Sequence, residues 1–470
     1  MRILFVASEI TPIAKIGGLG DVVGGLPKAL AENGIEVIIV TGYYGTHQEK
    51  KYPTKEITKS SLWWGGNNIL YSVRQGELPE SKVKIYYIVE PGIVGSGEVY
   101  GNPTAFATRQ VETERFLFIS KAAALLPKLI GFNPDLWHLH DWHAAAVTSF
   151  LPPNHAPTLL TIHNLANQGW AQPETAKKAG LENKGNQPVN IFGLGLKQAD
   201  WLSTVSPTYA LEIQAKPEGE GFENILKTRS ERLVGITNGI DTDFFNPESD
   251  EFLAARLKDD INYFKRQNRQ VLNKELNLKG DSTPLFGVVS RLTGQKGIEL
   301  AVKAIEPCLK KHQAQFVCLG VGDPALEELV NNLAARYPGQ AAGRFTFDER
   351  LAHVIYAAAD FFLLPSRFEP CGLGQLIAMR YATVPVVRAT GGLKDTVVDI
   401  KDKSGNGIVF IDYKVNALSK AITRALELYQ DRAKLELVRR RGWARESSWG
   451  AAAKQYLEFY KKICASKPQN

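Results

Sequence analysis

The chain has 470 residues and a formal net charge of +7; this length is too great for one hydrophobic core and predicts two or three domains. No block of Lys or Arg is long enough to indicate a nucleic-acid-binding protein, and the short run Arg439-Arg440-Arg441 indicates a solvated helix face. No apolar run approaches the ~20 residues of a membrane-spanning helix. The four cysteines show no CxxC spacing, which argues against a zinc site or a disulfide framework and fits a reducing compartment.

The first half of the chain alternates strand-like and helix-like segments. The opening run from Ile3 to Ala7 superficially resembles a signal peptide, but it is short and is closed by Glu9, so we interpret it as a buried strand. A helix ending at Gly34 and a second strand follow, which is the βαβ unit of a doubly wound sheet. The further elements predicted here are a helix over 113–129, strands over 136–139 and 158–162, and a long loop over 167–188.

A second α/β ladder follows. Its predicted strands cover 285–290, 316–320, 361–364 and 384–387, and its predicted helices cover 298–309, 325–335 and 376–380. Two ladders predict an α/β protein with two Rossmann-like domains facing a central cleft. We place the boundary at the turn-forming Asn238-Gly239-Ile240-Asp241, which gives domains over 1–239 and 240–445. The apolar helical spacing of 446–470 predicts a C-terminal helix that packs back on the first domain.

Two groups of polar residues follow predicted strands of the first domain. Lys15-Ile16-Gly17-Gly18-Leu19-Gly20-Asp21 opens a helix, and glycines, a helix N-terminus and a lysine together suit a phosphate, although a simple tight turn fits too. His138-Leu139-His140-Asp141-Trp142-His143 carries three histidines, but no further ligands with metal spacing are apparent, so we favour contacts of Asp141 and His143 with sugar hydroxyls over a metal site. His163 and Asn164 lie at another strand end.

The second domain carries three such groups. Arg291 and Lys296 flank a glycine and can converge on one diphosphate, with a solvated turn as the plain alternative. Thr390-Gly391-Gly392 offers backbone N–H groups at a helix start. Glu369, in the segment Ser366 to Leu373, follows a buried strand at the edge where open α/β sheets bind ligands.

These motifs together resemble those of the bacterial glycogen synthase and plant starch synthase family. The resembling segments are K-x-G-G-L at Lys15, D-W-H at Asp141, H-N-L at His163, T-V-S-P-T-Y-A at Thr204, S-R-L-x-x-Q-K-G at Ser290 and E-P-C-G-L at Glu369. They occur in the family's order over nearly the whole chain. The resemblance implies the two-domain glycosyltransferase fold called GT-B, with the acceptor on the first domain and the nucleotide sugar on the second. It implies transfer of glucose from ADP-glucose to the non-reducing end of an α-1,4-glucan such as glycogen or starch, with retention of configuration.

Roles carry over residue by residue. The resemblance implies five catalytic residues, namely Asp141, His163, Arg291, Lys296 and Glu369. It implies that substrate is bound by Lys15, Gly17, Gly18, Asp21, Tyr100, His143, Asn164, Asn238, Phe347, Cys371, Gly372, Leu373, Thr390, Gly391 and Gly392. Phe347 falls where some family members stack Tyr on the base, although an aromatic residue here is most often core.

The chain departs from the family at several positions. Gly374 replaces Thr, Phe245 replaces Trp, the loop over 218–221 is altered, and Ala358 and Ala382 stand where the family often has Gly. No departure removes a charged catalytic candidate, so we expect effects on donor affinity and local packing.

Other functions remain as alternatives at this stage. They are a sucrose- or trehalose-type enzyme with a small acceptor, a synthase that uses UDP-glucose, a phosphorylase with pyridoxal phosphate, and a non-catalytic glucan-binding protein. We expect no metal and no pyridoxal phosphate, because ADP-glucose is a co-substrate and the cations can stabilise its leaving group. No nucleic-acid or membrane partner is expected. We expect a bacterial cytoplasmic protein, with a plastid as the setting if the chain is a processed plant protein.

Overall fold

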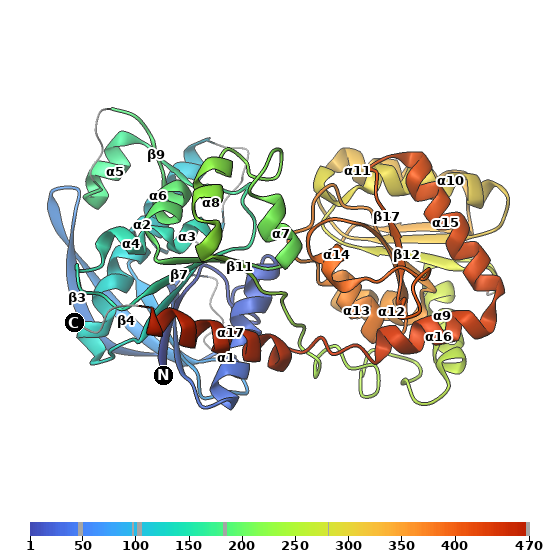
Figure 1. Cartoon of the computed structure of the whole chain (residues 1–470), viewed down its shortest axis with the longest axis horizontal. Coiled ribbons are helices and arrows are strands. Elements are labelled where there is room, and N and C mark those ends of the chain that lie inside the picture. Colours follow the sequence, from blue (N-terminus) through green and yellow to red (C-terminus); the bar gives the residue numbers. More distant parts are fainter. Residues whose placement is uncertain (46–49, 96–97, 101–105, 182–185, 281, 467–470) are drawn as a thin grey trace. The chain divides into compact units, whose positions relative to one another are not determined.

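The computed structural model describes residues 1–45, 50–95, 98–100, 106–181, 186–280 and 282–466. It divides into two compact units (Figure 1). Unit 1 comprises Met1–Gly239 with Trp449–Asn470, and unit 2 comprises Ile240–Ser448. Each contains a largely parallel sheet with helices, so the predicted pair of α/β domains is confirmed.

Unit 1 contains a nine-stranded sheet in the order β11-β10-β7-β6-β1-β2-β5-β4-β3. All neighbours pair in parallel except at β4, which is antiparallel to both β3 and β5. The strands are β1 Arg2–Val6, β2 Glu36–Gly42, β3 Lys55–Trp64, β4 Asn67–Glu77, β5 Lys84–Val89, β6 Leu136–His140, β7 Thr158–Ile162, β10 Trp201–Thr204 and β11 Leu233–Gly235. The buried β1, β6 and β7 therefore lie next to one another, which brings their carboxyl ends to one edge of the sheet.

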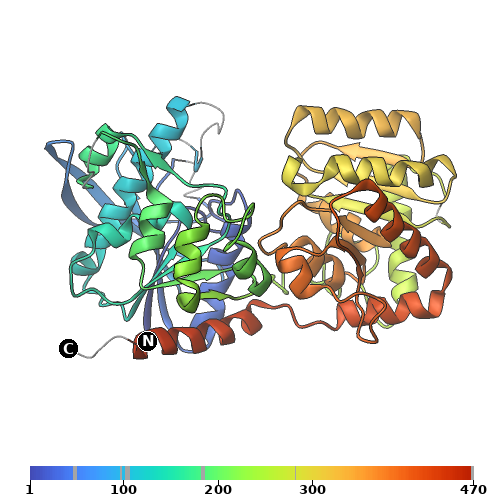
Figure 2. The ribbon, with the colours of Figure 1, turned by 45° about the horizontal axis from the view of Figure 1, so that its top comes forward.

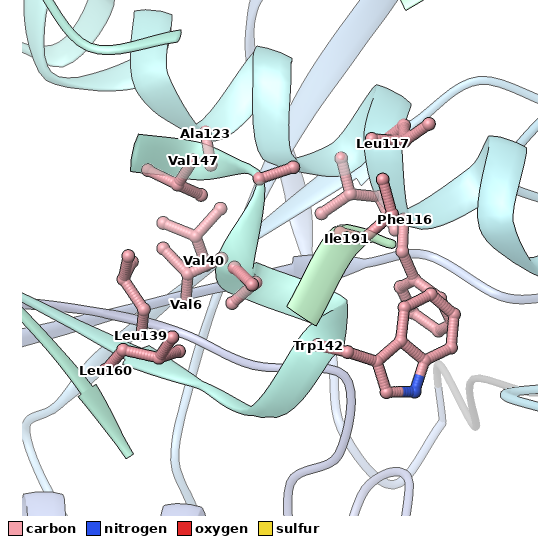
Figure 3. Close-up of a cluster of buried hydrophobic side chains, with 14 of the residues drawn as sticks. Val6, Val40, Phe116, Leu117, Ala123, Leu139, Trp142, Val147, Leu160 and Ile191 are labelled. Atoms are coloured by element: carbon pink, nitrogen blue, oxygen red, sulfur yellow. The ribbon is translucent and has the colours of Figure 1, made fainter. Parts of the chain in front are cut away.

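Helices cover both faces of this sheet. The helices of unit 1 are α1 Gly18–Glu32, α2 Phe106–Ile130, α3 Asp141–Ala145, α4 Val147–Phe150, α5 Pro173–Ala179, α6 Ile191–Gln198, α7 Pro207–Glu212, α8 Glu223–Thr228 and α17 Trp449–Ala465. Because side chains alternate along a strand, Val6 joins a core with Phe116 and Leu117 of α2 (Figure 3), whereas Phe5 joins a core with α1 and α17.

The C-terminal helix α17 belongs to unit 1, where it lies beside α1 (Figures 1 and 2). Its apolar face, including Tyr456 and Tyr460, is buried against the sheet. The Tyr460 hydroxyl lies 2.8 Å from Nδ1 of His138 on β6, so the end of the chain is tied to a central strand.

Unit 2 contains a parallel six-stranded sheet in the order β14-β13-β12-β15-β16-β17. The strands are β12 Leu285–Val289, β13 Gln315–Leu319, β14 Ala341–Arg344, β15 Phe361–Leu364, β16 Val384–Arg388 and β17 Ile408–Phe410. The helices are α9 Ile261–Leu276, α10 Ile298–Lys310, α11 Pro324–Arg336, α12 Glu349–Ala358, α13 Gly374–Arg380, α14 Gly391–Thr396, α15 Val415–Gln430 and α16 Arg432–Trp443. Across the described residues, every helix is too short or too polar to cross a lipid bilayer.

One prediction about a segment is wrong, and the predicted solvated face at Arg439-Arg440-Arg441 is wrong at Arg439, whereas Arg440 is exposed. The segment 167–188, predicted as a loop, contains β8 Trp170–Ala171 and α5, because Pro173 starts that helix and Gly180, at φ 80°, ends it. Arg439 does not lie on a solvated face. Its guanidinium is buried and donates to Asp360 Oδ1 at 2.5 Å, which compensates the cost of burying both charges.

We predict unequal costs for placing glycine at the two alanines that depart from the family. Ala382 follows α13 in the left-handed region, at φ 53°, where a Cβ costs about 1 kcal/mol. Ala358 lies in α12, where Gly costs about 1 kcal/mol relative to Ala. Both side chains are buried, so each substitution also loses a methyl contact. Both variants should have a lower free energy of unfolding than wild type. The loss should be larger for Ala358→Gly than for Ala382→Gly, by roughly 1–2 kcal/mol. Urea unfolding of both variants measures the difference, and equal losses would contradict the strain at Ala382.

Candidate active site

The predicted site residues gather at the carboxyl ends of strands in each unit. In unit 1 they follow β1, β6, β7 and β11, and in unit 2 they follow β12, β14, β15 and β16. Tyr100 lies between β5, which is parallel to β2, and α2, so it too follows a strand of this sheet. This edge is where parallel α/β sheets bind ligands.

Glu9, which follows β1, organises the glycine loop of unit 1. Its carboxylate accepts hydrogen bonds from the backbone of Ile16 at 2.9 Å and of Gly17 at 2.6 Å, and from the Tyr100 hydroxyl at 2.8 Å. The Glu9 side chain is buried, so these donors replace the water it has lost. From the sequence, Glu9 was predicted only as the end of an apolar run. Like Glu369, however, it is a carboxylate at the carboxyl end of a buried strand, which was a signal for a site residue.

The loop's lysine is paired within the same unit. Lys15 Nζ lies 2.7 Å from Asp21 Oδ1, in the first turn of α1. Both side chains are partly exposed. The lysine is thus held beside the N-terminus of α1, where the helix dipole also favours an anion.

Asp141 holds the loop that follows β7. Its Oδ1 accepts from the backbone N–H of His163 at 2.7 Å and from that of Asn164 at 3.4 Å. Asp141 itself has φ 55°, an uncommon conformation for a residue with a Cβ. Burial raises the pKa of its carboxyl to about 7, although the two backbone donors oppose the shift. Near neutral pH the site therefore holds a carboxyl group that can be charged or neutral.

The imidazoles near Asp141 are neutral. Burial lowers the pKa of His163 and of His143 to about 3. His163 Nε2 lies 3.0 Å from His140 Nδ1. The ring of His143 packs among Phe116, Trp142 and Tyr100, and its Nδ1 has no partner among the described residues.

In unit 2, Glu369 and Lys296 form an ion pair. Lys296 Nζ lies 2.6 Å from Glu369 Oε2, which also accepts from the Ser366 hydroxyl at 2.9 Å. Glu369 is 4% exposed. Two of the five predicted catalytic residues thus contact each other directly.

The second glycine turn packs against the Glu369 loop. The backbone N–H of Gly392 donates to the Glu369 carbonyl at 3.1 Å. A Cβ on Gly391, which has φ 43°, would lie 1.9 Å from that same carbonyl. Only glycine permits this approach, so Thr390-Gly391-Gly392 and Glu369 are assembled as one structure.

Other predicted residues lie apart from these contacts. Arg291 is exposed and forms no ion pair within the described part of the chain. Phe347 is 81% exposed, so it is not a core residue. Asn238 is buried with its Oδ1 unpartnered among the described residues. In the segment after Glu369, Cys371 is buried, Gly372 has φ 73°, and Leu373 packs on a neighbouring core.

Two family models match this chain. Residues 2–228 match the starch synthase catalytic domain, and residues 253–437 match the glycosyl transferases group 1. Glycogen synthases of Alkaliphilus metalliredigens and Rhodospirillum rubrum are 37% and 39% identical to it. Each alignment covers 98% of this chain, with 100% and 98% of the respective relative.

Two solved structures are similar to this chain over nearly its whole length. The catalytic domain of starch synthase IV from Arabidopsis thaliana, bound to ADP and acarbose, has a TM-score of 0.88 and 32% identity over 99% of both chains. A sucrose-phosphate synthase from Thermosynechococcus elongatus has a TM-score of 0.64 at 20% identity, covering 99% of this chain and 100% of that one, and shows the fold alone.

We predict that Asp141 weakens the fold as the pH rises. A raised pKa means that folded protein binds the proton more tightly than unfolded chain. This contribution is therefore present below about pH 4 and is lost as the pH rises to about 7. Asp141→Asn keeps an acceptor oxygen and has no proton to lose. Its free energy of unfolding relative to wild type should rise by roughly 2–4 kcal/mol between pH 4 and pH 7, as urea unfolding measures.

The exposed Asp412 provides the control for this experiment. Asp412→Asn removes one negative charge at an exposed position, and so controls for the change in net charge. A constant difference between Asp141→Asn and wild type across the same range would show that the Asp141 carboxyl has an ordinary pKa.

We predict that Lys296 stabilises unit 2 through Glu369. Lys296→Met leaves a buried carboxylate with only the Ser366 hydroxyl, and should lower the free energy of unfolding by about 1–3 kcal/mol. The double variant Lys296→Met/Glu369→Gln should recover part of that loss. Lys303→Met breaks an exposed pair with Glu299 and should cost under about 1 kcal/mol. If Lys296→Met and Lys303→Met lowered the free energy of unfolding equally, the pair of Lys296 with Glu369 would contribute no more than an exposed pair.

Proposed function

This chain belongs to the glycogen and starch synthase family, and we propose that it transfers glucose from ADP-glucose to the non-reducing end of an α-1,4-glucan, with retention of configuration. The observation that carries the proposal is the Lys296–Glu369 pair joined to the glycine turn at Gly391. It brings a cation, a carboxylate and a glycine turn together at one edge of the sheet, which suits a sugar diphosphate. The starch synthase bound to ADP and acarbose supports an adenine nucleotide and a glucan-like acceptor as ligands.

We assign unit 2 to the nucleotide sugar. Arg291 and Lys296 can bind the diphosphate and stabilise the negative charge that grows on it as the bond to glucose breaks. The glycine turn at the start of α14 packs against the Glu369 loop and so holds Glu369 beside Lys296. The exposed ring of Phe347 can stack on the adenine base. Stacking uses the face of the aromatic ring, so the hydroxyl group of a tyrosine is not needed.

We assign unit 1 to the glucosyl group, the acceptor and part of the phosphate binding. Asp141 and His163 suit the hydroxyls of the transferred sugar, and Tyr100, His143, Asn164 and Asn238 suit the remaining polar contacts. Lys15 can exchange its partner Asp21 for a phosphate oxygen. Glu9 holds the loop around Gly17 in the shape that presents Lys15 and the start of α1.

The reaction requires one bond to break and one to form. The bond between glucose C1 and the diphosphate oxygen breaks, and the electron pair leaves with the diphosphate. The C1–O4 bond to the glucan forms on the same face, and the proton of the acceptor hydroxyl passes to the departing phosphate oxygen. The positive charge that develops on the sugar ring is stabilised by carboxylate oxygens, for which Asp141 and Glu369 are the candidates. The bacterial origin of the relatives leads us to propose a bacterial cytoplasmic setting.

The test is release of nucleotide from ADP-glucose and from UDP-glucose, with and without glycogen, alongside incorporation of radiolabelled glucose. We expect ADP release that depends on glycogen and matches the incorporation, with UDP-glucose the poorer donor. Glu369→Ala should abolish transfer and leave the circular dichroism spectrum unchanged. Stronger use of UDP-glucose, or transfer only to a small acceptor, would establish one of the alternative synthases. Wild-type turnover by Glu369→Ala would remove this residue from the mechanism.

A further inference from the structure

Histidine side chains form two successive diagonal contacts between β6 and β7. These strands are parallel, with His138 level with Leu159 and His140 level with Thr161. His138 Nε2 lies 2.6 Å from Thr161 Oγ1, and His140 Nδ1 lies 3.0 Å from His163 Nε2. Each histidine of β6 therefore contacts the residue two positions beyond its register partner. The second contact reaches the side chain assigned to the sugar.

The ring of His140 is fixed on several sides. It lies 4.2 Å from the ring of His138 and 5.1 Å from that of Phe5, measured between centroids, and it has no exposed surface. Its second nitrogen, Nε2, has no hydrogen-bond partner among the described residues. The contact with His163 is thus the one hydrogen bond that this ring makes within the described part of the chain.

The unpartnered nitrogen indicates where the protons lie. A neutral imidazole carries one N–H, and a buried N–H without an acceptor is costly. If His140 carried its proton on Nε2, that donor would be buried and unpaired. With the proton on Nδ1, His140 donates to His163 Nε2, and the proton of His163 then lies on Nδ1. His163 Nδ1 has no partner among the described residues, so its N–H is available to a sugar oxygen.

We propose that His140 is a positioning residue that sets the ring orientation and the tautomer of His163. Asp141, the next residue along the chain, holds the backbone N–H of the same histidine. Adjacent residues at the end of β6 thus hold His163 by its side chain and by its main chain. The proposal rests on the proposed function in assigning His163 to the sugar, whereas the tautomer can be measured without any turnover.

The first experiment determines the tautomer in the full-length protein. Histidine labelled with ¹⁵N gives multiple-bond proton–nitrogen correlations that distinguish protonated from unprotonated ring nitrogens, and the signal absent from His163→Gln identifies His163. We expect the proton of His163 on Nδ1. A proton on Nε2 in the wild-type protein would overturn the proposal, whatever the protein's activity.

Two substitutions then separate positioning from packing. His140→Leu fills similar space without a donor, and should shift His163 towards the other tautomer and lower kcat by ~10²-fold with little change in KM. His140→Asn returns an N–H near the position of Nδ1, and should keep the tautomer and most of the activity. Tyr460→Phe removes only the hydroxyl that contacts His138, and should leave both readouts as in wild type.

Three results would contradict or decide the positioning role of His140. A fall in melting temperature for His140→Leu with unchanged tautomer and kcat would reduce His140 to a packing residue and overturn the proposal. An equal loss of activity in His140→Asn would do the same, because the restored donor would have no effect. If His140→Leu does not fold, the role of His140 is still tested by the tautomer of His163 in the wild-type protein and by the activity of His140→Asn. Absence of glucosyl transfer by the wild-type protein would refute the proposed function and leave the tautomer measurement to decide the role of His140.

Discussion

Three buried carboxylates at the carboxyl ends of strands hold the loops on which the rest of the candidate site depends. Glu9 holds the glycine loop after β1, Asp141 holds the loop after β7, and Glu369 holds the position of Lys296. A buried carboxylate is stable only when hydrogen-bond donors or cations replace its water. Because each buried carboxylate must be paired with such donors or cations, it fixes the loops that supply them.

This arrangement explains why glycine is needed at position 391. Gly391 lets the loop at the start of α14 approach the Glu369 carbonyl more closely than a Cβ would allow. At Gly17 the nitrogen lies 2.6 Å from the Glu9 carboxylate, but a Cβ there would meet Glu9 only at an ordinary contact distance. In both units a carboxylate-bearing loop and a glycine loop support each other.

Much of the fold could be predicted from the sequence, because buried parallel strands are continuous apolar runs. The predicted bounds of 158–162 and 361–364 coincide with β7 and β15. The hairpin of β3 and β4 was missed, since Trp63 is exposed while Leu62 and Trp64 are buried, and the alternation is short. The turn Gly65-Gly66, with positive φ at both residues, was the available signal.

The site was less predictable than the fold. Residue types and their place after strands identified Asp141, His163, Lys296 and Glu369, but not which of them contact each other. The pairing of His163 with His140 depends on the register between β6 and β7. Lys15 and Asp21 belong to one short segment, but the shape of its glycine loop decides whether they meet. For Arg439, too, the sequence pattern does not show which residue is its partner. Leu435, Val438 and Gly442 on the same helix are buried, a spacing that indicates an inward face, but only the fold shows that Asp360 lies there to receive the charge.

The central claim is that these strand-end groups serve transfer of glucose from a nucleotide sugar to the end of a glucan. The most direct measurement is the position and linkage of glucose transferred from ¹³C-labelled ADP-glucose to a short linear maltooligosaccharide, determined by NMR of the product. The account predicts label in α-1,4 linkage at the non-reducing end. Label in a β linkage, at the reducing end or in a disaccharide formed from a small acceptor would contradict it.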